Sequence, residues 1–485
     1  MHTPGESDRG IKAQMQRLAR NAVALAAGGI VAQLAFTLLE ILVARKLGAE
    51  AYGVFVTAYA WTVLGACLIE FGTSFWTIQE GSRNLSRLPA LLGSALTVNL
   101  FVFAVLYLLL AVVANALSPN PVLSLLLVIL PYGLILTLQS ELGAIYSSHQ
   151  TMHVNAFFQG LAPVAILIVY FAYSTRELDI ADVAAAYVIG GALVTGIWFA
   201  HTLRSIRPQF STADIRTTLR SSYQYALSSV LGQVYLKVDI VMLSALAGLR
   251  EAGIYAAAFK LVELVLKVAV LSGRVFAPAM FKASHESDKA FQIFASLMTR
   301  SLAVAGLLAG VVSFVLAEEL IFFMFGEAYD ASVPVLRILG GVMAAKCMIV
   351  SLQLVLSSID LHFQRVTSLS IAVVAHIVAN ALLIPTFGAL GAAIATLASG
   401  ILIILLYAYS ASRRRSLRFS RWLFVPTCLA AAVAIAVPFS GVNAFVQAGI
   451  TVCVFLVGLY LIGFVHRGEI RFVLQSLLTN NRQQP

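Results

Sequence analysis

Three positively charged side chains recur at intervals of seven residues in an otherwise apolar segment, residues 254–280: Lys260, Lys267 and Arg274. An α-helix turns once in about 3.6 residues, so positions seven apart lie on nearly the same face. A charge at the centre of a bilayer costs about 2.5–3.5 kcal/mol, even on the lenient insertion scale. We therefore expect this cationic stripe to face a water-filled cavity or an anionic partner, which favours a negatively charged passenger.

Nearby charges modify this expectation. Glu263 lies three residues after Lys260 and four before Lys267, so it can pair with either along the helix. One such pair still leaves the stripe with a positive surplus. Lys237 and Asp239, two residues apart in the preceding apolar segment, lie on roughly opposite sides of a helix. They cannot simply neutralise each other, so at least one needs a partner elsewhere.

Acidic residues also occur inside apolar segments, including Glu40, Glu70 and Glu141. A carboxylate within the membrane can carry a coupling proton or sodium ion, and Glu70 is the candidate for that role. The alternative is that the intramembrane charges form interior salt bridges that fix how the helices align. The sequence contains no phosphate-binding GxxxxGK[ST] loop and no recognisable catalytic triad or zinc-hydrolase pattern. His149 and His153 have the i, i+4 spacing of metal ligands, but no third ligand lies near them in the sequence, so we interpret them as surface residues. We therefore expect no catalytic site, cofactor or metal.

The composition is that of a polytopic membrane protein. Of 485 residues, 60% are hydrophobic and only 11% are charged, and the mean hydropathy is +0.91. Soluble domains carry about 25% charged residues. The net charge of +10 lies largely in short loops beside apolar segments, which is the pattern of the positive-inside rule rather than of nucleic-acid binding.

The apolar segments predict an all-α integral membrane protein with about fourteen transmembrane helices. The expected spans are 21–44, 54–76, 90–115, 122–145, 154–174, 183–203, 221–246, 254–280, 293–316, 333–357, 366–384, 390–409, 422–438 and 444–465. With both termini cytoplasmic, roughly two thirds of the 32 Lys and Arg residues fall on the cytoplasmic side. Those on the opposite side are Arg45, Lys46, Arg176 and Arg250.

Loop lengths and charges divide the chain. We expect two six-helix lobes around a central cavity, followed by two C-terminal helices. The expected divisions are a cytoplasmic tail (1–20), an N-lobe (21–203), a cytoplasmic linker (204–220), a C-lobe (221–409), a basic loop with helices 13 and 14 (410–465) and a cytoplasmic tail (466–485).

A short internal repeat supports the two-lobe division. The sequence LGAEAYGVF at 47–55 precedes the second span, and LAGLREAGIY at 246–255 precedes the eighth. Gly53 aligns with Gly253 and Phe55 with Tyr255, an offset of 200 residues and six spans. Because six is even, both copies keep one orientation, which predicts a parallel repeat about an axis normal to the membrane. A chance match is the alternative.

Four stretches resemble the polysaccharide transporter family, bacterial flippases of lipid-linked oligosaccharides such as O-antigen units. That family belongs to the multidrug/oligosaccharidyl-lipid/polysaccharide exporter superfamily. The stretches are ARKLGAEAYGVF (44–55), KVDIVMLSALAGLREAGIYAAAFKL (237–261), FGEAYDASVPVLRIL (325–339) and IPTFGALGAAIATLASG (384–400). The likeness is more specific for the superfamily than for the substrate.

The resemblance implies alternating access in the bacterial cytoplasmic (inner) membrane and a passenger of undecaprenyl diphosphate bearing a short glycan. Lys260, Lys267 and Arg274, with Lys237 as a fourth contact, would bind the diphosphate or an acidic sugar. Asp239 and Glu263 would tune the field or move ions. Membrane lipids are expected partners, with a polysaccharide polymerase and chain-length machinery as further candidates.

Three other functions stay open. A flippase of lipid-linked peptidoglycan precursor also combines fourteen helices with a basic cavity. A drug or cation antiporter of the same superfamily usually has twelve helices and an acidic cavity, which the cationic stripe disfavours. An integral-membrane polymerase or ligase generally needs a sizeable outer loop, whereas the longest one expected, at 317–332, is short.

Overall fold

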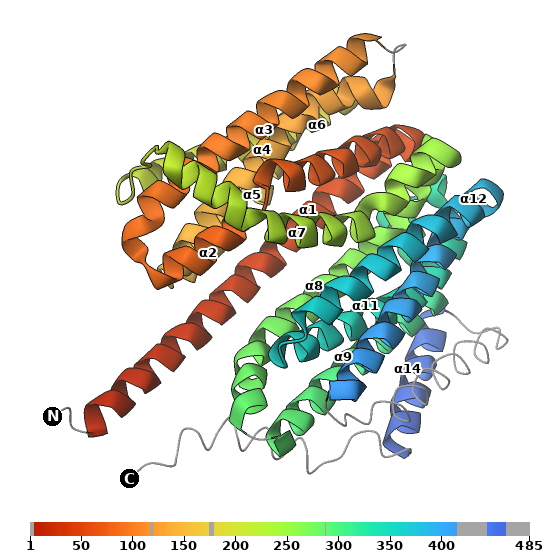
Figure 1. Ribbon diagram of the computed structural model, residues 1–485. Helices are drawn as coiled ribbons and strands as arrows, with labels where there is room; N and C mark the ends of the chain where they lie inside the picture. Colours follow the sequence, from red (N-terminus) through yellow and green to blue (C-terminus); the bar gives the residue numbers. More distant parts are fainter. Residues whose placement is uncertain (1–3, 117–119, 174–178, 287, 415–443, 462–485) are drawn as a thin grey trace. The chain divides into compact units, whose positions relative to one another are not determined.

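The computed structural model describes residues 4–116, 120–173, 179–286, 288–414 and 444–461, and every regular element in these ranges is helical (Figure 1). The elements of the first part are α1 (Pro4–Glu70), α2 (Thr73–Arg83), the 3-10 helix η1 (Leu85–Arg87), α3 (Leu88–Ala116), α4 (Pro121–Ser148), α5 (Met152–Tyr173) and α6 (Ile180–Leu203). Those that follow are α7 (Thr212–Leu246), α8 (Leu249–Glu286), α9 (Asp288–Val315), α10 (Ala317–Phe325), η2 (Glu327–Tyr329), α11 (Ser332–Ser358), α12 (His362–Arg414) and α14 (Ala444–Leu461). The predicted helical class is confirmed for these ranges.

Nine helices in the described ranges are long and apolar enough to cross a membrane. Helix α8, which carries the cationic stripe, is not among them, because charged side chains recur along its 38 residues. The predicted span 422–438 lies outside the described residues. The structure therefore establishes a multi-pass helical membrane protein, whereas the count of fourteen stays a prediction.

Glycines split two of the long helices. In α1, Gly48 has φ 77°, and in α12, Gly388 has φ 54°, so each unbroken label covers two predicted spans. Figure 1 shows α1 turning back on itself, and the Tyr52 hydroxyl donates to the Glu40 carboxylate across the turn at 3.1 Å. At the α12 turn, the Glu251 carboxylate accepts from the Ala389 N–H at 2.8 Å, which stabilises the positive end of the new helix.

The predicted second span, 54–76, was wrong at its end. Helix α1 stops at Glu70, because Phe71 and Gly72 both have positive φ, and α2 begins afresh at Thr73. A Cβ on Gly72 would lie 2.6 Å from the Ala226 nitrogen in α7. The break therefore brings the α7 backbone against the chain where only glycine fits, which apolar composition alone cannot reveal.

The described chain forms two compact units. Unit 1 comprises Met1–Ala257 and Ile377–Ala392, and unit 2 comprises Ala258–His376 and Ala393–Pro485. Within unit 1, α1 packs along α4, α5 and α7, and α5 packs along α6. Within unit 2, α9 packs along α11 and also contacts α14. The division into six-helix lobes at 204–220 remains a prediction.

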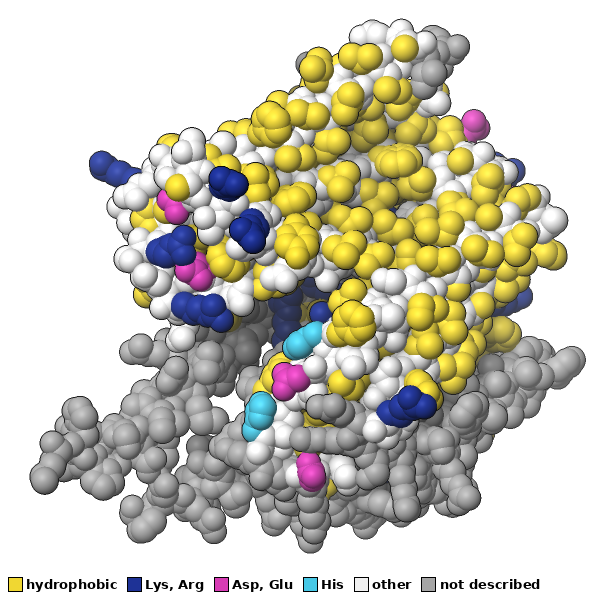
Figure 2. All heavy atoms as spheres, in the orientation of Figure 1, with side chains coloured by type: hydrophobic (Ala, Val, Ile, Leu, Met, Phe, Trp, Pro, Cys, Tyr) yellow, Lys and Arg dark blue, Asp and Glu magenta, His cyan; other side chains and the backbone are white. Residues whose placement is uncertain are grey.

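Apolar side chains cover much of the visible surface (Figure 2). Helix α3 is the clearest case, since its most apolar window has a mean hydropathy of 2.6 and yet only 17% of it is buried. Its exposed residues include Leu100, Phe101, Leu108, Leu109, Val112 and Val113. Soluble monomers rarely expose apolar patches of this kind, whereas a helix in contact with lipid does so by necessity.

Candidate functional site

The cationic stripe lies on α8 within unit 2, and its members become more exposed along the helix. Lys260 is buried, Lys267 is half-buried and Arg274 is exposed. The Lys260 Nζ donates to the Glu263 carboxylate at 2.6 Å, which confirms the predicted intrahelical pair. Within the part of the chain that the structure describes, Lys267 and Arg274 make no ion pair. The predicted positive surplus of α8 therefore resides in these two residues.

The geometry of the stripe suits an extended anionic group. From Lys260 to Arg274 the helix rises about 21 Å. Lysine and arginine bind phosphate and carboxylate oxygens through charge-assisted hydrogen bonds, which are roughly twice as strong as neutral ones. With Lys260 occupied by Glu263, the groups available to such a ligand are those of Lys267 and Arg274.

Asp239 lies in unit 1, where two neutral side chains donate hydrogen bonds to its carboxylate. It is 2% exposed, and it accepts from the Tyr255 hydroxyl at 2.7 Å and from the Asn380 side-chain amide at 3.0 Å. These bonds link α7, α8 and α12. Asn380 was not selected from the sequence, because it lies 141 residues from Asp239 and no local spacing connects the two positions.

Lys237 lies beside an aromatic cluster. Its Nζ is 5.9 Å from the centre of the Tyr59 ring, within the range of a cation–π contact. The ring of Tyr59 also contacts Tyr132 of α4 and Tyr187 of α6. We call Tyr59, Tyr132 and Tyr187 the tyrosine cluster. Sequence spacing does not predict this cluster, because its members come from three separate helices.

Glu70 has a second carboxylate close by, that of Glu141 on α4. Ser140, the residue before Glu141, donates to Glu70 at 2.9 Å, and Thr77 donates to Glu141 at 3.1 Å. The Thr73 hydroxyl contacts both the Glu141 carboxylate and the main-chain oxygen of Glu70. Neither carboxylate forms an ion pair with any described residue. The break after α1 therefore collects two acids whose hydrogen-bond donors are hydroxyl groups.

The predicted site residues thus fall into two sets. Unit 1 contains Glu70, Lys237 and Asp239, and unit 2 contains Lys260, Glu263, Lys267 and Arg274. Each set lies within a single unit.

The internal repeat has a structural counterpart in unit 1. Gly48 and Gly248, which are 200 residues apart, both have positive φ, at 77° and 100°. A Cβ on Gly53 would lie 1.8 Å from the Leu249 oxygen, and a Cβ on Gly253 would lie 2.0 Å from the Ala49 oxygen. Adding the offset of 200 residues to Gly53 and Ala49 gives Gly253 and Leu249, so the two contacts are related by a local two-fold axis. The repeat is thus confirmed at this crossing, whereas the parallel repeat of six spans stays a prediction. We call this contact the glycine crossing.

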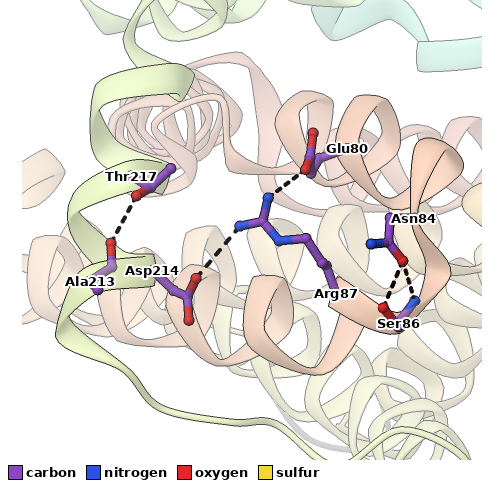
Figure 3. A network of polar contacts seen from close by, with 7 residues as sticks. All are labelled: Glu80, Asn84, Ser86, Arg87, Ala213, Asp214 and Thr217. Atoms are coloured by element: carbon purple, nitrogen blue, oxygen red, sulfur yellow. Dashed lines mark hydrogen bonds and ion pairs between the residues drawn. The ribbon is translucent and has the colours of Figure 1, made fainter.

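Basic side chains gather at the opposite end of unit 1, where α2, α3 and α7 meet (Figure 2). Arg87 pairs there with Glu80 and with Asp214, the latter at 3.5 Å (Figure 3). The Asn84 side chain caps η1 by accepting from the Ser86 N–H at 3.1 Å. The exposed arginines of this region lie at the end of α2, in the segment before α7 and in the first turns of α7: Arg83, Arg204, Arg207, Arg216 and Arg220. Such a concentration is typical of cytoplasmic loops.

Comparison of the sequence with known proteins identifies a family and more distant relatives. A family model described as polysaccharide biosynthesis protein matches residues 18–284, which is more than half of the chain. The probable flippase AglR of Haloferax volcanii is 27% identical over 242 residues, covering 49% of each chain. The teichuronic acid biosynthesis protein TuaB of Bacillus subtilis is 24% identical over 290 residues, covering 57% of this chain and 58% of TuaB. The matches thus span about half the length of these curated relatives.

Solved structures agree at the level of the fold. The lipid II flippase MurJ in an inward closed conformation has a TM-score of 0.72 at 14% identity, covering 91% of this chain and 98% of MurJ. An inward-facing multidrug resistance transporter of the MATE family has a TM-score of 0.63 at 15% identity, covering 82% of this chain and 99% of that transporter. The chain is therefore a multi-pass membrane protein with a MurJ- and MATE-like fold, and it belongs to the polysaccharide biosynthesis protein family.

Proposed function

We propose that the protein is a flippase that moves undecaprenyl-diphosphate-linked oligosaccharide from the inner to the outer face of the bacterial cytoplasmic membrane. The observation that carries the proposal is the cationic stripe of α8, in which Lys267 and Arg274 make no ion pair with described residues. Membership of the polysaccharide biosynthesis family and the likeness to a protein named as a probable flippase support it.

In this proposal the stripe binds the diphosphate. Charge-assisted hydrogen bonds from Lys267 and Arg274 replace water around the phosphate oxygens, while the polyprenyl tail stays in the bilayer. Lys260 is already paired with Glu263 and so sets the local field rather than binding the ligand directly. Lys267 and Arg274, which make no ion pair with the described residues, match a diphosphate in charge, and this match disfavours a cationic drug as the passenger.

Glu70 is the proposed coupling residue, together with Glu141. Glu141 is buried and Glu70 is half-buried. Carboxylates within the membrane that have no basic partner can exchange a proton or bind a cation, and residues of this kind mark ion pathways in membrane proteins. Asp239 differs, because Tyr255 and Asn380 hold its carboxylate between three helices. Its proposed role is to transmit movement among α7, α8 and α12.

Alternating access requires the two predicted lobes to separate in turn at each membrane face. The glycine crossing lies next to the turns after Gly48 and Gly248, which the charge distribution assigns to the outer side. We assign it the role of an outer closure, which separates when the passenger leaves. The polar network around Arg87, drawn in Figure 3, lies at the proposed cytoplasmic end.

The proposal is tested by depleting the protein and measuring on which membrane face lipid-linked oligosaccharide accumulates. Build-up on the inner face with intact sugar synthesis is expected. Lys267→Ala should reduce translocation at near-normal protein abundance, and Arg220→Ala, at an exposed arginine near the start of α7, should not. Activity of Lys267→Ala equal to that of the parent would remove this residue from the site.

A second candidate is a flippase of lipid-linked peptidoglycan precursor, favoured by the likeness to MurJ over 91% of this chain. The same depletion distinguishes the two functions. Accumulation of the peptidoglycan precursor, with polysaccharide intermediates unchanged, would select the second. Unchanged lipid intermediates with altered drug tolerance would select an antiporter.

A further inference from the structure

Tyr59 is the most accessible member of the tyrosine cluster. It is half-buried, whereas Tyr132 and Tyr187 are almost fully buried. Its ring stacks against Phe55 at 6.1 Å between centres and lies 5.8 Å from the Tyr187 ring, which it meets edge to face. Contacts on several sides fix the orientation of the Tyr59 ring. A rigid, partly open aromatic ring is suited to bind a flat apolar surface.

Lys237 supplies a cation beside this ring. It is also half-buried, with its Nζ 5.9 Å from the Tyr59 ring centre. The Tyr187 hydroxyl is buried and has no hydrogen-bond partner among the described residues. The cluster therefore contains polar hydrogen-bonding capacity that its described neighbours do not satisfy, which is unusual for a purely structural aromatic core.

The pair lies near the middle of its helices. Tyr59 follows the Gly48 turn by about 16 Å of helix, and Lys237 precedes the end of α7 at Leu246 by about 14 Å. Half the hydrocarbon thickness of a bilayer is about 15 Å. A lysine facing lipid at that depth is costly, so we place the pair in the protein interior. Transporters bind substrates near this level.

An aromatic ring next to an ammonium group matches the chemistry of a sugar. The C–H face of a pyranose stacks on an aromatic ring, and its hydroxyl or carboxylate oxygens accept hydrogen bonds from lysine. Neither a polyprenyl tail nor a diphosphate uses both features. A tail has no acceptor for the ammonium group, and a diphosphate has no apolar face for the ring.

We infer that Tyr59 and Lys237 form a binding subsite for the sugar rings of the passenger, separate in role from the diphosphate-binding stripe of α8. This inference rests on the proposed flippase function. It assigns to Lys237 recognition of the glycan rather than of the diphosphate.

The experiment uses the full-length protein in detergent and two probes: undecaprenyl diphosphate, and lipid-linked oligosaccharide extracted from the membranes of the host. Tyr59→Leu should weaken binding of the glycan-bearing probe by about three- to tenfold, the size of one lost aromatic contact. Binding of undecaprenyl diphosphate should be unchanged. Tyr59→Phe, which keeps the ring, should bind both probes like the parent.

Two controls complete the design. Tyr223→Leu, at a tyrosine 62% exposed on α7, should change neither affinity. Lys267→Gln should weaken binding of both probes, because both carry the diphosphate. If Tyr59→Leu fails to fold, Lys237→Gln carries the same comparison.

The outcomes of this experiment distinguish failure of the sugar subsite from failure of the proposed flippase function. Equal losses for both probes in Tyr59→Leu or Lys237→Gln, or no loss in either variant, would overturn the sugar subsite and leave the flippase proposal standing. Failure of the parent protein to bind either probe would overturn the proposed function itself.

Discussion

Lys260 and Glu263 show how a charge is tolerated inside α8. The lysine side chain is 7% exposed and that of the glutamate 24%, so the pair is largely removed from solvent. Removing one partner of such a pair is more harmful than removing both, because an uncompensated charge then stays buried.

Glu263→Gln should therefore reduce the free energy of unfolding of the purified protein by about 1–3 kcal/mol, after allowance for the partial exposure of Glu263. Its melting temperature should fall accordingly. The double variant Lys260→Met/Glu263→Gln should recover most of the loss. Thermal unfolding in detergent measures both effects. A double variant less stable than the single one would contradict the explanation that the uncompensated Lys260 charge causes the loss.

The two carboxylates at the end of α1 make a different prediction. If Glu70 and Glu141 exchange the coupling ion, Glu141→Gln should abolish the dependence of transport on an imposed proton or sodium gradient. Glu80→Gln, in the loop network of Figure 3, is the matched control and should keep that dependence. Transport in vesicles with and without each gradient measures this. Gradient dependence that persists in Glu141→Gln would exclude Glu141 from coupling.

At the level of single residues, the sequence predicts local partners and misses distant ones. Helical spacing predicts that Glu263 pairs with Lys260 or with Lys267, and the structure shows the pair with Lys260. The partner of Lys237 on α1 and that of Asp239 on α12 depend on how helices pack. The spacing of residues in a single sequence does not indicate contacts between separate helices. The sequence therefore does not predict Tyr59 as the partner of Lys237 or Asn380 as the partner of Asp239.

At the scale of the helices, the glycine crossing brings the backbones of α1 and α8 into very close contact. The second arm of α1 and the start of α8 meet backbone to backbone, leaving less than a carbon atom's width for a side chain at Gly53 or Gly253. A larger residue at either position must push the two helices apart.

Gly253→Leu should thus expose the interior from the outer side. A reporter cysteine at Thr57, which is buried on α1, should be unreactive in the parent background and react with a membrane-impermeant maleimide in Gly253→Leu. Gly232→Leu is the matched control, because a Cβ there meets nothing within 4 Å. Equal labelling in all three backgrounds would contradict the role of the crossing as an outer closure.

Helix prediction succeeded where apolar length is the only requirement and failed at the break after Glu70. The first residues after that break include Phe71, Phe75 and Trp76, and their apolar side chains resemble a continuation of the span. What ends α1 is the positive φ of Phe71 and Gly72 at the point where α7 passes. The turns at Gly48 and Gly388 were placed correctly between spans, because glycine and neighbouring polar residues mark them in the sequence.

For the whole molecule, the strongest statement concerns orientation. Arginines gather in the loops at 83–88 and 203–212, at one end of unit 1 (Figure 2). Since short basic loops stay in the cytoplasm, these loops should be inside and the segment around η2 should be outside.

Cysteine labelling in intact cells checks that orientation. Glu327→Cys, in η2, should react with an impermeant reagent, whereas Ser86→Cys should react only after the cells are permeabilised. The reverse pattern would invert the topology and also the direction of transport that we propose.

The membrane class followed from composition, and the family followed from short motifs that extend across much of the chain. The candidate site was only partly accessible from sequence. The stripe of α8 is periodic and so was visible, whereas the tyrosine cluster and the pairing of Glu70 with Glu141 exist only after folding.

The glycine crossing also limits how this chain can change over evolutionary time. In most packed contacts, growth of one side chain is offset by shrinkage of its neighbour. Here both partners are already the smallest residue that the genetic code provides, so neither can yield room to the other. Any enlargement must be absorbed by a shift of the main chain, and a related sequence with a bulkier residue at either position should have its two helices set further apart.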